Sequence, residues 1–168
     1  PRFTPSCTNE LMAWLGEQAR TRGLYVQSHL SENLREIELV RQLHPDCSQY
    51  WETYDRFGLW RDHTIMAHCV YSDEREQDAM IGSNVLCVHC PDSNINICSG
   101  FAPVRRMKRR GVWVALGSDI AGGAQLPMMR VMTACIRASK ARAIITGGED
   151  AFLTVGEAYY LATSAGAR

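Results

Sequence analysis

Short apolar runs alternate with longer stretches of helical periodicity along this chain. The apolar runs cover residues 24–29, 64–68, 85–89 and 112–117. Around them, apolar residues recur every three or four positions, which predicts helices over residues 10–20, 34–43, 48–57, 74–81, 104–110 and 127–143 and after residue 154. Short buried strands that alternate with helices form parallel sheets covered on both faces. The pattern therefore predicts an α/β fold built from parallel strand–helix units, with no internal repeat or linker.

Capping residues support several of these boundaries. In a capping box, a short polar side chain at the helix start and a glutamate three residues later bond each other's backbone N–H groups. Three pairs have this spacing: Asn33 with Glu36, Asp73 with Glu76, and Thr154 with Glu157. The segments between helices are expected to be a polar loop at residues 91–94 and a tight turn at 122–123 that leaves room beside Asp119. The basic run at residues 105–110 is expected to form the solvated face of its helix.

Composition narrows the classes of function. The 168 residues carry 18 Lys plus Arg and 18 Asp plus Glu, so net charge indicates neither a nucleic-acid nor a membrane-surface partner. No apolar run approaches the roughly 18 residues of a membrane helix, and no secretory signal is visible. The 7 cysteines are odd in number, which favours reduced thiols in a cytoplasmic protein. Cys87, His89 and Cys90 lack the second half of a zinc finger, so no structural zinc site is expected.

Polar side chains stand at the ends of the predicted strands. His29, His68 and His89 end the first three, and Asp119 follows the fourth. The carboxyl ends of parallel strands lie on one face, so these side chains are expected to converge. Imidazole and carboxylate ligands suit zinc or iron(II), and the sequence therefore predicts a metal site there.

Other candidate residues have a second interpretation. Glu32, three residues after His29, is spaced to carry protons for a water that the metal activates, but it could equally cap the next helix. His44 and His63 lie beside turns and are expected to be solvated. Arg2 and Phe3 lie beside a proline in what could be an ordinary loop.

Five segments together resemble the amidohydrolase superfamily, and within it the members that deaminate guanine. The similarity spans essentially all 168 residues and follows the family's order: Pro1-Arg2-Phe3, His29-Leu30-Ser31-Glu32-Asn33, Ala67-His68, His89-Cys90-Pro91-Asp92-Ser93-Asn94, and Gly117-Ser118-Asp119-Ile120-Ala121-Gly122-Gly123. The resemblance implies a TIM-type (β/α)8 barrel. It also implies a zinc ion (iron(II) is possible), held by His29, His68 and Asp119.

The resemblance implies further roles for single residues. Glu32 would be the proton shuttle, while Asp119 and His68 would take part in catalysis. Arg2 would direct its guanidinium to the carbonyl oxygen of guanine, and Phe3 would place its ring against the purine. A homodimer is expected on the same ground.

One departure from the family pattern is large. The family supplies two further ligands from an H-x-H pair, and no H-x-H occurs in residues 1–168. We therefore expect a single segment of the barrel, from about the end of the fourth strand to the helix after the eighth. Cys69 and Asp92 also depart from the family pattern. Both lie beside the expected ligands, so they bear on the fine substrate specificity and not on the chemistry. The alternatives left open are an iron(II) oxygenase, a hydrolase of another aminated purine, pyrimidine, pterin or triazine, and a non-catalytic barrel relative.

Overall fold

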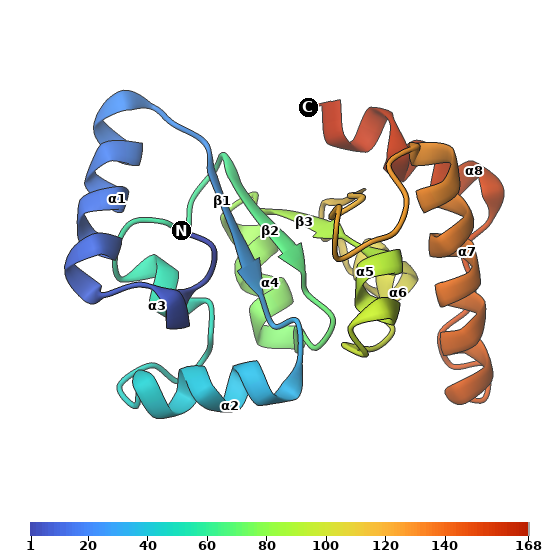
Figure 1. Cartoon of the computed structure of the whole chain (residues 1–168), viewed down its shortest axis with the longest axis horizontal. Helices are drawn as coiled ribbons and strands as arrows, with labels where there is room; N and C mark the ends of the chain where they lie inside the picture. Colours follow the sequence, from blue (N-terminus) through green and yellow to red (C-terminus); the bar gives the residue numbers. More distant parts are fainter. Residues whose placement is uncertain (168) are drawn as a thin grey trace.

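A four-stranded parallel sheet forms the centre of the structure, a computed structural model that describes residues 1–167 (Figure 1). Its strands follow one another in chain order: β1 (Val26–Leu30), β2 (Thr64–His68), β3 (Leu86–His89) and β4 (Val114–Leu116). This confirms the predicted parallel strand–helix units.

Helices precede, connect and follow the strands. In chain order they are η1 (Thr4–Ser6), α1 (Asn9–Arg22), α2 (Leu34–Leu43), α3 (Glu52–Asp55), α4 (Glu74–Gly82), α5 (Pro91–Asn96), α6 (Val104–Arg110), α7 (Met128–Ile145), α8 (Val155–Ala162) and η2 (Ser164–Ala167). Helices α1 to α3 lie on the β1 side of the sheet, and α7 and α8 lie on the opposite side, where both contact β4 (Figure 1). Among residues 1–167, no helix is both long and apolar enough to cross a bilayer.

The strand register places the reactive strand ends side by side. Leu30 lies opposite His68 in the β1–β2 pair, and His89 lies opposite Leu116 in the β3–β4 pair. Because all the strands point the same way, the residues that follow them emerge at one edge of the sheet.

Several predicted boundaries agree with the structure. The Asn33–Glu36 and Thr154–Glu157 capping boxes are both formed, and Asp73 accepts the backbone N–H of Glu76. The 7 cysteines are free thiols, as expected for a chain without a disulfide framework.

Two expected connections differ from the structure. Residues 91–94 are not a loop but the start of α5, where Pro91 occupies a first-turn position that needs no backbone N–H. The helix expected over residues 48–57 is helical only from Glu52 to Asp55, because the side chain of Glu52 caps the backbone N–H groups of Ser48 and Gln49 before it.

The histidine predictions were partly wrong. His63 is exposed as expected, but His44 is buried, with only 7% of its surface accessible. The turn after α2, closed by a hydrogen bond from Cys47 N to the His44 carbonyl, returns the chain over the ring. There His44 lines a cavity of about 160 Å³ together with Cys47 and Glu76. Burial lowers the pKa of His44, so the ring is neutral at physiological pH.

The basic helix α6 is only partly a solvated face. Arg106 bonds Glu74 at 2.7 Å and Arg110 bonds Asp78 at 2.6 Å, both on α4. Lys108 approaches Glu157 of α8 at 3.6 Å. The run therefore connects α6 to its two neighbouring helices, although exposed ion pairs of this kind contribute little stability each.

Glycine is required at one position in α1. A Cβ atom on Gly16 would lie 1.7 Å from the carbonyl oxygen of Phe57, a backbone atom that cannot move aside cheaply. The predicted apolar face of this helix is buried at Met12 and Ala19, whereas Trp14 remains 59% exposed. Gly16 therefore sets how closely α1 approaches the segment before β2.

We predict that Gly16→Ala destabilises the complete gene product by about 1–3 kcal/mol, because the helix must move away from Phe57. Thermal or denaturant unfolding measures the change. Gly156→Ala, in α8, is the matched control because nothing lies within 4 Å of its new methyl group. It should be neutral or stabilising by less than about 1 kcal/mol. Equal stability of the two variants would contradict the packing described for α1.

Candidate metal centre and active site

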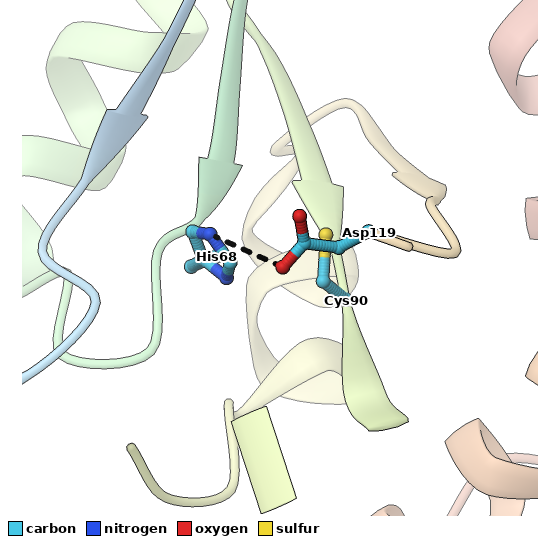
Figure 2. Close-up of side chains that lie close together, drawn as sticks. All are labelled: His68, Cys90 and Asp119. Atoms are coloured by element: carbon cyan, nitrogen blue, oxygen red, sulfur yellow. Dashed lines mark ion pairs between the residues drawn. The ribbon is translucent and has the colours of Figure 1, made fainter. Parts of the chain in front are cut away.

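His68 ends β2 inside the protein and is oriented by one hydrogen bond. Its side chain is 1% exposed, and its Nδ1 lies 2.9 Å from Oδ1 of Asn94 on α5. The amide oxygen only accepts, so Nδ1 carries the proton and Nε2 keeps its lone pair. Within residues 1–167, Nε2 has no hydrogen-bond partner although it is buried. It faces Oδ2 of Asp119 at 3.9 Å (Figure 2).

His29 presents its ring in the same way. Its Nδ1 donates to the carbonyl oxygen of Arg2 at 2.6 Å, which leaves Nε2 with its lone pair. The ring centroids of His29 and His68 are 4.9 Å apart. Burial lowers the pKa of His29, and the nearby His68 acts in the same direction. Burial also lowers the pKa of His68, so both imidazoles are neutral at physiological pH, as metal ligation requires.

Asp119 lies at the start of the loop after β4, with its backbone in the left-handed region at φ 44°. The glycines that follow are needed for close packing. A Cβ on Gly122 would lie 2.9 Å from Oδ2 of Asp119, and one on Gly123 would lie 2.2 Å from the carbonyl oxygen of Ser118. The predicted turn with room beside Asp119 is therefore confirmed.

Glu32 turns its side chain into the site and does not cap the next helix. Glu36 performs that capping, since its carboxylate accepts the backbone N–H groups of Glu32 and Asn33. The Oε1 atom of Glu32 accepts a hydrogen bond from Ser99 Oγ at 3.3 Å and lies 3.5 Å from Nδ1 of His68. Burial raises the pKa of Glu32, which suits a group that must both take and release protons.

Three potential ligand atoms cluster closely enough to hold one metal ion. Those of His68, Cys90 and Asp119 lie within 4.8 Å of one another (Figure 2). Cys90 was not predicted, although it directly follows the strand-ending His89. Burial raises the pKa of its thiol to about 12, which disfavours the thiolate that a metal prefers. The free Nε2 of His68 facing Asp119 is the feature that fits a zinc-type ion, with His29 on the adjoining strand as a further donor.

Neither His29 nor His89 belongs to this close group of three, although the His29 ring lies beside that of His68. His89 is 2% exposed, and burial lowers its pKa to about 3. Two further contacts were missed by sequence reasoning: Asn94 orients His68, and Ser99 bonds Glu32. Asn94 lies in the H-C-P-x-S-N segment, so that motif was the available signal; Ser99 had none.

Arg2 and Phe3 lie beside the site. The guanidinium of Arg2 stacks over the Phe3 ring at 4.4 Å, and this ring lies 6.5 Å from that of His29. The Arg2 carbonyl oxygen accepts two hydrogen bonds from His29, one from its backbone N–H and one from its Nδ1. The segment therefore orients a candidate ligand, a role that the sequence did not reveal.

The parallel strand–helix units, with polar groups gathered at the carboxyl ends of the strands, have the organisation of part of a (β/α)8 barrel. The amidohydrolase family profile matches residues 1–168, and the chain belongs to that family. The fold prediction is thereby confirmed.

Individual relatives agree with this assignment. Guanine deaminase of Dictyostelium discoideum is 39% identical over 168 residues, and that of Homo sapiens is 36% identical. Each match covers 100% of this chain and 37% of the relative. A crystal structure of guanine deaminase from C. acetobutylicum, with guanine in its active site, superposes with a TM-score of 0.95 at 46% identity and covers 99% of this chain and 40% of the other. The chain thus spans less than half the length of these relatives.

We predict that Asn94→Ala weakens the affinity for any divalent metal ion held at this site by about 10- to 100-fold, because His68 loses the partner that fixes its ring and its tautomer. Chelator competition with the complete gene product measures the affinity. Asn84→Ala is the control. Asn84 lies before β3, at the other end of the sheet, and its side chain donates a hydrogen bond of the same 2.9 Å length to Asp62. Unchanged affinity in Asn94→Ala would contradict the orienting role.

Proposed function

We propose that the complete protein catalyses the hydrolytic deamination of guanine to xanthine and ammonia. The observation that carries the proposal is the buried His68, whose neutral ring lies between the carboxylates of Glu32 and Asp119. Similarity to guanine deaminases over the whole of this chain, including one solved with bound guanine, supports the choice of substrate. The runner-up is a related hydrolase of another aminated purine, pyrimidine, pterin or triazine.

Zinc is the proposed metal, and iron(II) is the alternative. His29, His68 and Asp119 would hold it, since nitrogen and carboxylate donors suit zinc. A bound zinc-type ion lowers the pKa of water from about 15.7 to about 7, which supplies a nucleophile at neutral pH. Metal analysis of the purified protein distinguishes zinc from iron(II), and anaerobic turnover separates hydrolysis from an iron(II) oxygenase reaction.

Glu32 would carry the first proton. It takes a proton from the attacking water and gives it to the ring nitrogen next to the carbon that bears the amine. Protonation makes that carbon more electrophilic as the new C–O bond forms. The raised pKa of Glu32, caused by burial, favours both halves of this transfer. Ser99 fixes the carboxylate during it.

Asp119 would complete the reaction. Its carboxylate takes the second proton of the attacking water and passes it to the amine, which leaves as ammonia as the C–N bond breaks. The oxygen remains on the ring as the new carbonyl of xanthine. The neutral ring of His68, 3.9 Å from Asp119, steadies the charge that develops as these protons move.

Arg2 and Phe3 would bind the purine. The Arg2 guanidinium is exposed and lies against the Phe3 ring, so it is free to donate hydrogen bonds to a carbonyl oxygen. Phe3 offers an aromatic face near His29. A cytoplasmic location and a homodimer also remain predictions; gel filtration with light scattering tests the second.

We predict that Glu32→Gln lowers kcat for guanine by about 10² to 10⁴ while bound zinc is retained, because the amide cannot carry protons. Ammonia release and metal analysis of the same sample are the measurements. Glu38→Gln, on the exposed face of α2, is the control and should leave both unchanged. Near-normal deamination by Glu32→Gln would refute the proton-transfer role.

We predict that Arg2→Ala raises KM for guanine by about tenfold or more with zinc content unchanged, since it removes a charge-assisted hydrogen bond to the purine. Steady-state kinetics with guanine and a panel of other aminated heterocycles is the measurement. Arg35→Ala, an exposed arginine on α2, is the control. An unaltered KM argues against substrate binding by Arg2, and a preference of the parent protein for another heterocycle selects the runner-up function.

A further inference from the structure

The loop that carries Asp119 is tied to α5 at two points. The carboxylate of Asp92 accepts the backbone N–H of Ala124 at 2.6 Å. The side-chain amide of Asn96 donates to the carbonyl oxygen of Gly122 at 2.9 Å. Asp92 and Asn96 are four residues apart and therefore lie on the same face of this short helix. Together the two bonds fix the distance between α5 and residues 122–124.

That distance determines where the Asp119 carboxylate lies. A Cβ on Gly122 would lie 2.6 Å from Ser93 Oγ on α5 and 2.9 Å from Oδ2 of Asp119. Gly122 is therefore packed between α5 and the Asp119 carboxylate. In the part of the chain that the structure describes, no hydrogen-bond donor reaches the Asp119 carboxylate, and its side chain is 34% exposed. The path of the loop is therefore the main restraint on this side chain.

The same helix also fixes His68. Asn94, between the two tying residues, bonds Nδ1 of His68. Helix α5 is thus the element that sets the position of Asp119 relative to the free Nε2 of His68, which it faces at 3.9 Å. Asp92 is half-buried at the edge of a cleft of about 380 Å³ that also contains Ile95, Gln125, Arg130 and Arg137. Its side chain can therefore be shortened without a cavity forming in the core.

We propose that Asp92 is a positioning residue for Asp119: by holding the backbone of Ala124 against α5, it keeps the Asp119 carboxylate at the distance from His68 that binding and proton transfer require. The inference rests on the proposed function, because it concerns the same site. It assigns a role to a residue outside the proposed metal ligands and substrate-binding residues. Asn96 contributes to the same positioning, because its side chain holds the backbone carbonyl of Gly122 against α5.

The test uses the complete gene product and measures zinc affinity by chelator competition together with kcat and KM for guanine. Asp92→Ala should weaken zinc affinity by about tenfold or more and lower kcat to a similar degree, with KM little changed, as is typical for residues that orient metal ligands. Asp92→Asn keeps an oxygen acceptor for Ala124 N and should restore both quantities to within about threefold of the parent. Asn96→Ala should also weaken zinc affinity and lower kcat.

Asp62→Ala is the matched control. Asp62 accepts a comparable 2.9 Å hydrogen bond from Asn84, but it precedes β2 at the far end of the sheet, so its loss should leave zinc affinity and kcat unchanged. If Asp92→Ala and Asn96→Ala both behave like Asp62→Ala, the inference is overturned. If the parent protein binds zinc but does not deaminate guanine, the proposed function fails, and the zinc measurements alone decide the role of Asp92.

Discussion

The hydrogen bond from Nδ1 of His68 to Asn94 is the interaction on which the rest of the site depends. It fixes the tautomer of a buried ring and directs the lone pair of Nε2 towards Asp119. The backbone carbonyl of Arg2 fixes the tautomer of His29 in the same way, by accepting the hydrogen bond of its Nδ1. Both imidazoles are kept neutral by burial, which lowers their pKa values. The protein fold itself therefore sets the tautomer and the charge state of both rings.

The backbone at the strand ends makes this arrangement possible. Ser31, His68, Cys69 and Asp119 all adopt positive φ angles, between 44° and 73°, which L-residues other than glycine rarely do. Each such residue costs on the order of 1 kcal/mol, and strained residues of this kind concentrate at functional sites. Ser31 and Cys69 directly follow β1 and β2, His68 is the last residue of β2, and Asp119 comes three residues after β4. The register of β1 and β2 already places their ends side by side. The sheet fixes the positions of the strand ends, and at two of these residues, His68 and Asp119, the side chains face each other.

Much of this could be predicted from the sequence, because the patterns involved are local. Helix α2, with its Asn33–Glu36 capping box, and strand β2 have the boundaries that periodicity indicated. The approach of His68 to Asp119, with His29 beside His68, followed from their places after apolar runs. What could not be predicted depends on contacts between distant segments. The burial of His44 results from a returning turn, and the bond from Ser99 to Glu32 joins residues 67 positions apart.

We propose above that residues at the strand ends of this chain hold a zinc ion. Diffraction from zinc-loaded crystals of the complete gene product, recorded on both sides of the zinc absorption edge, tests it most directly. The account predicts one anomalous peak enclosed by Nε2 of His29, Nε2 of His68 and the carboxylate of Asp119. A peak elsewhere, or one bound through Cys90 with His29 turned away, would contradict it.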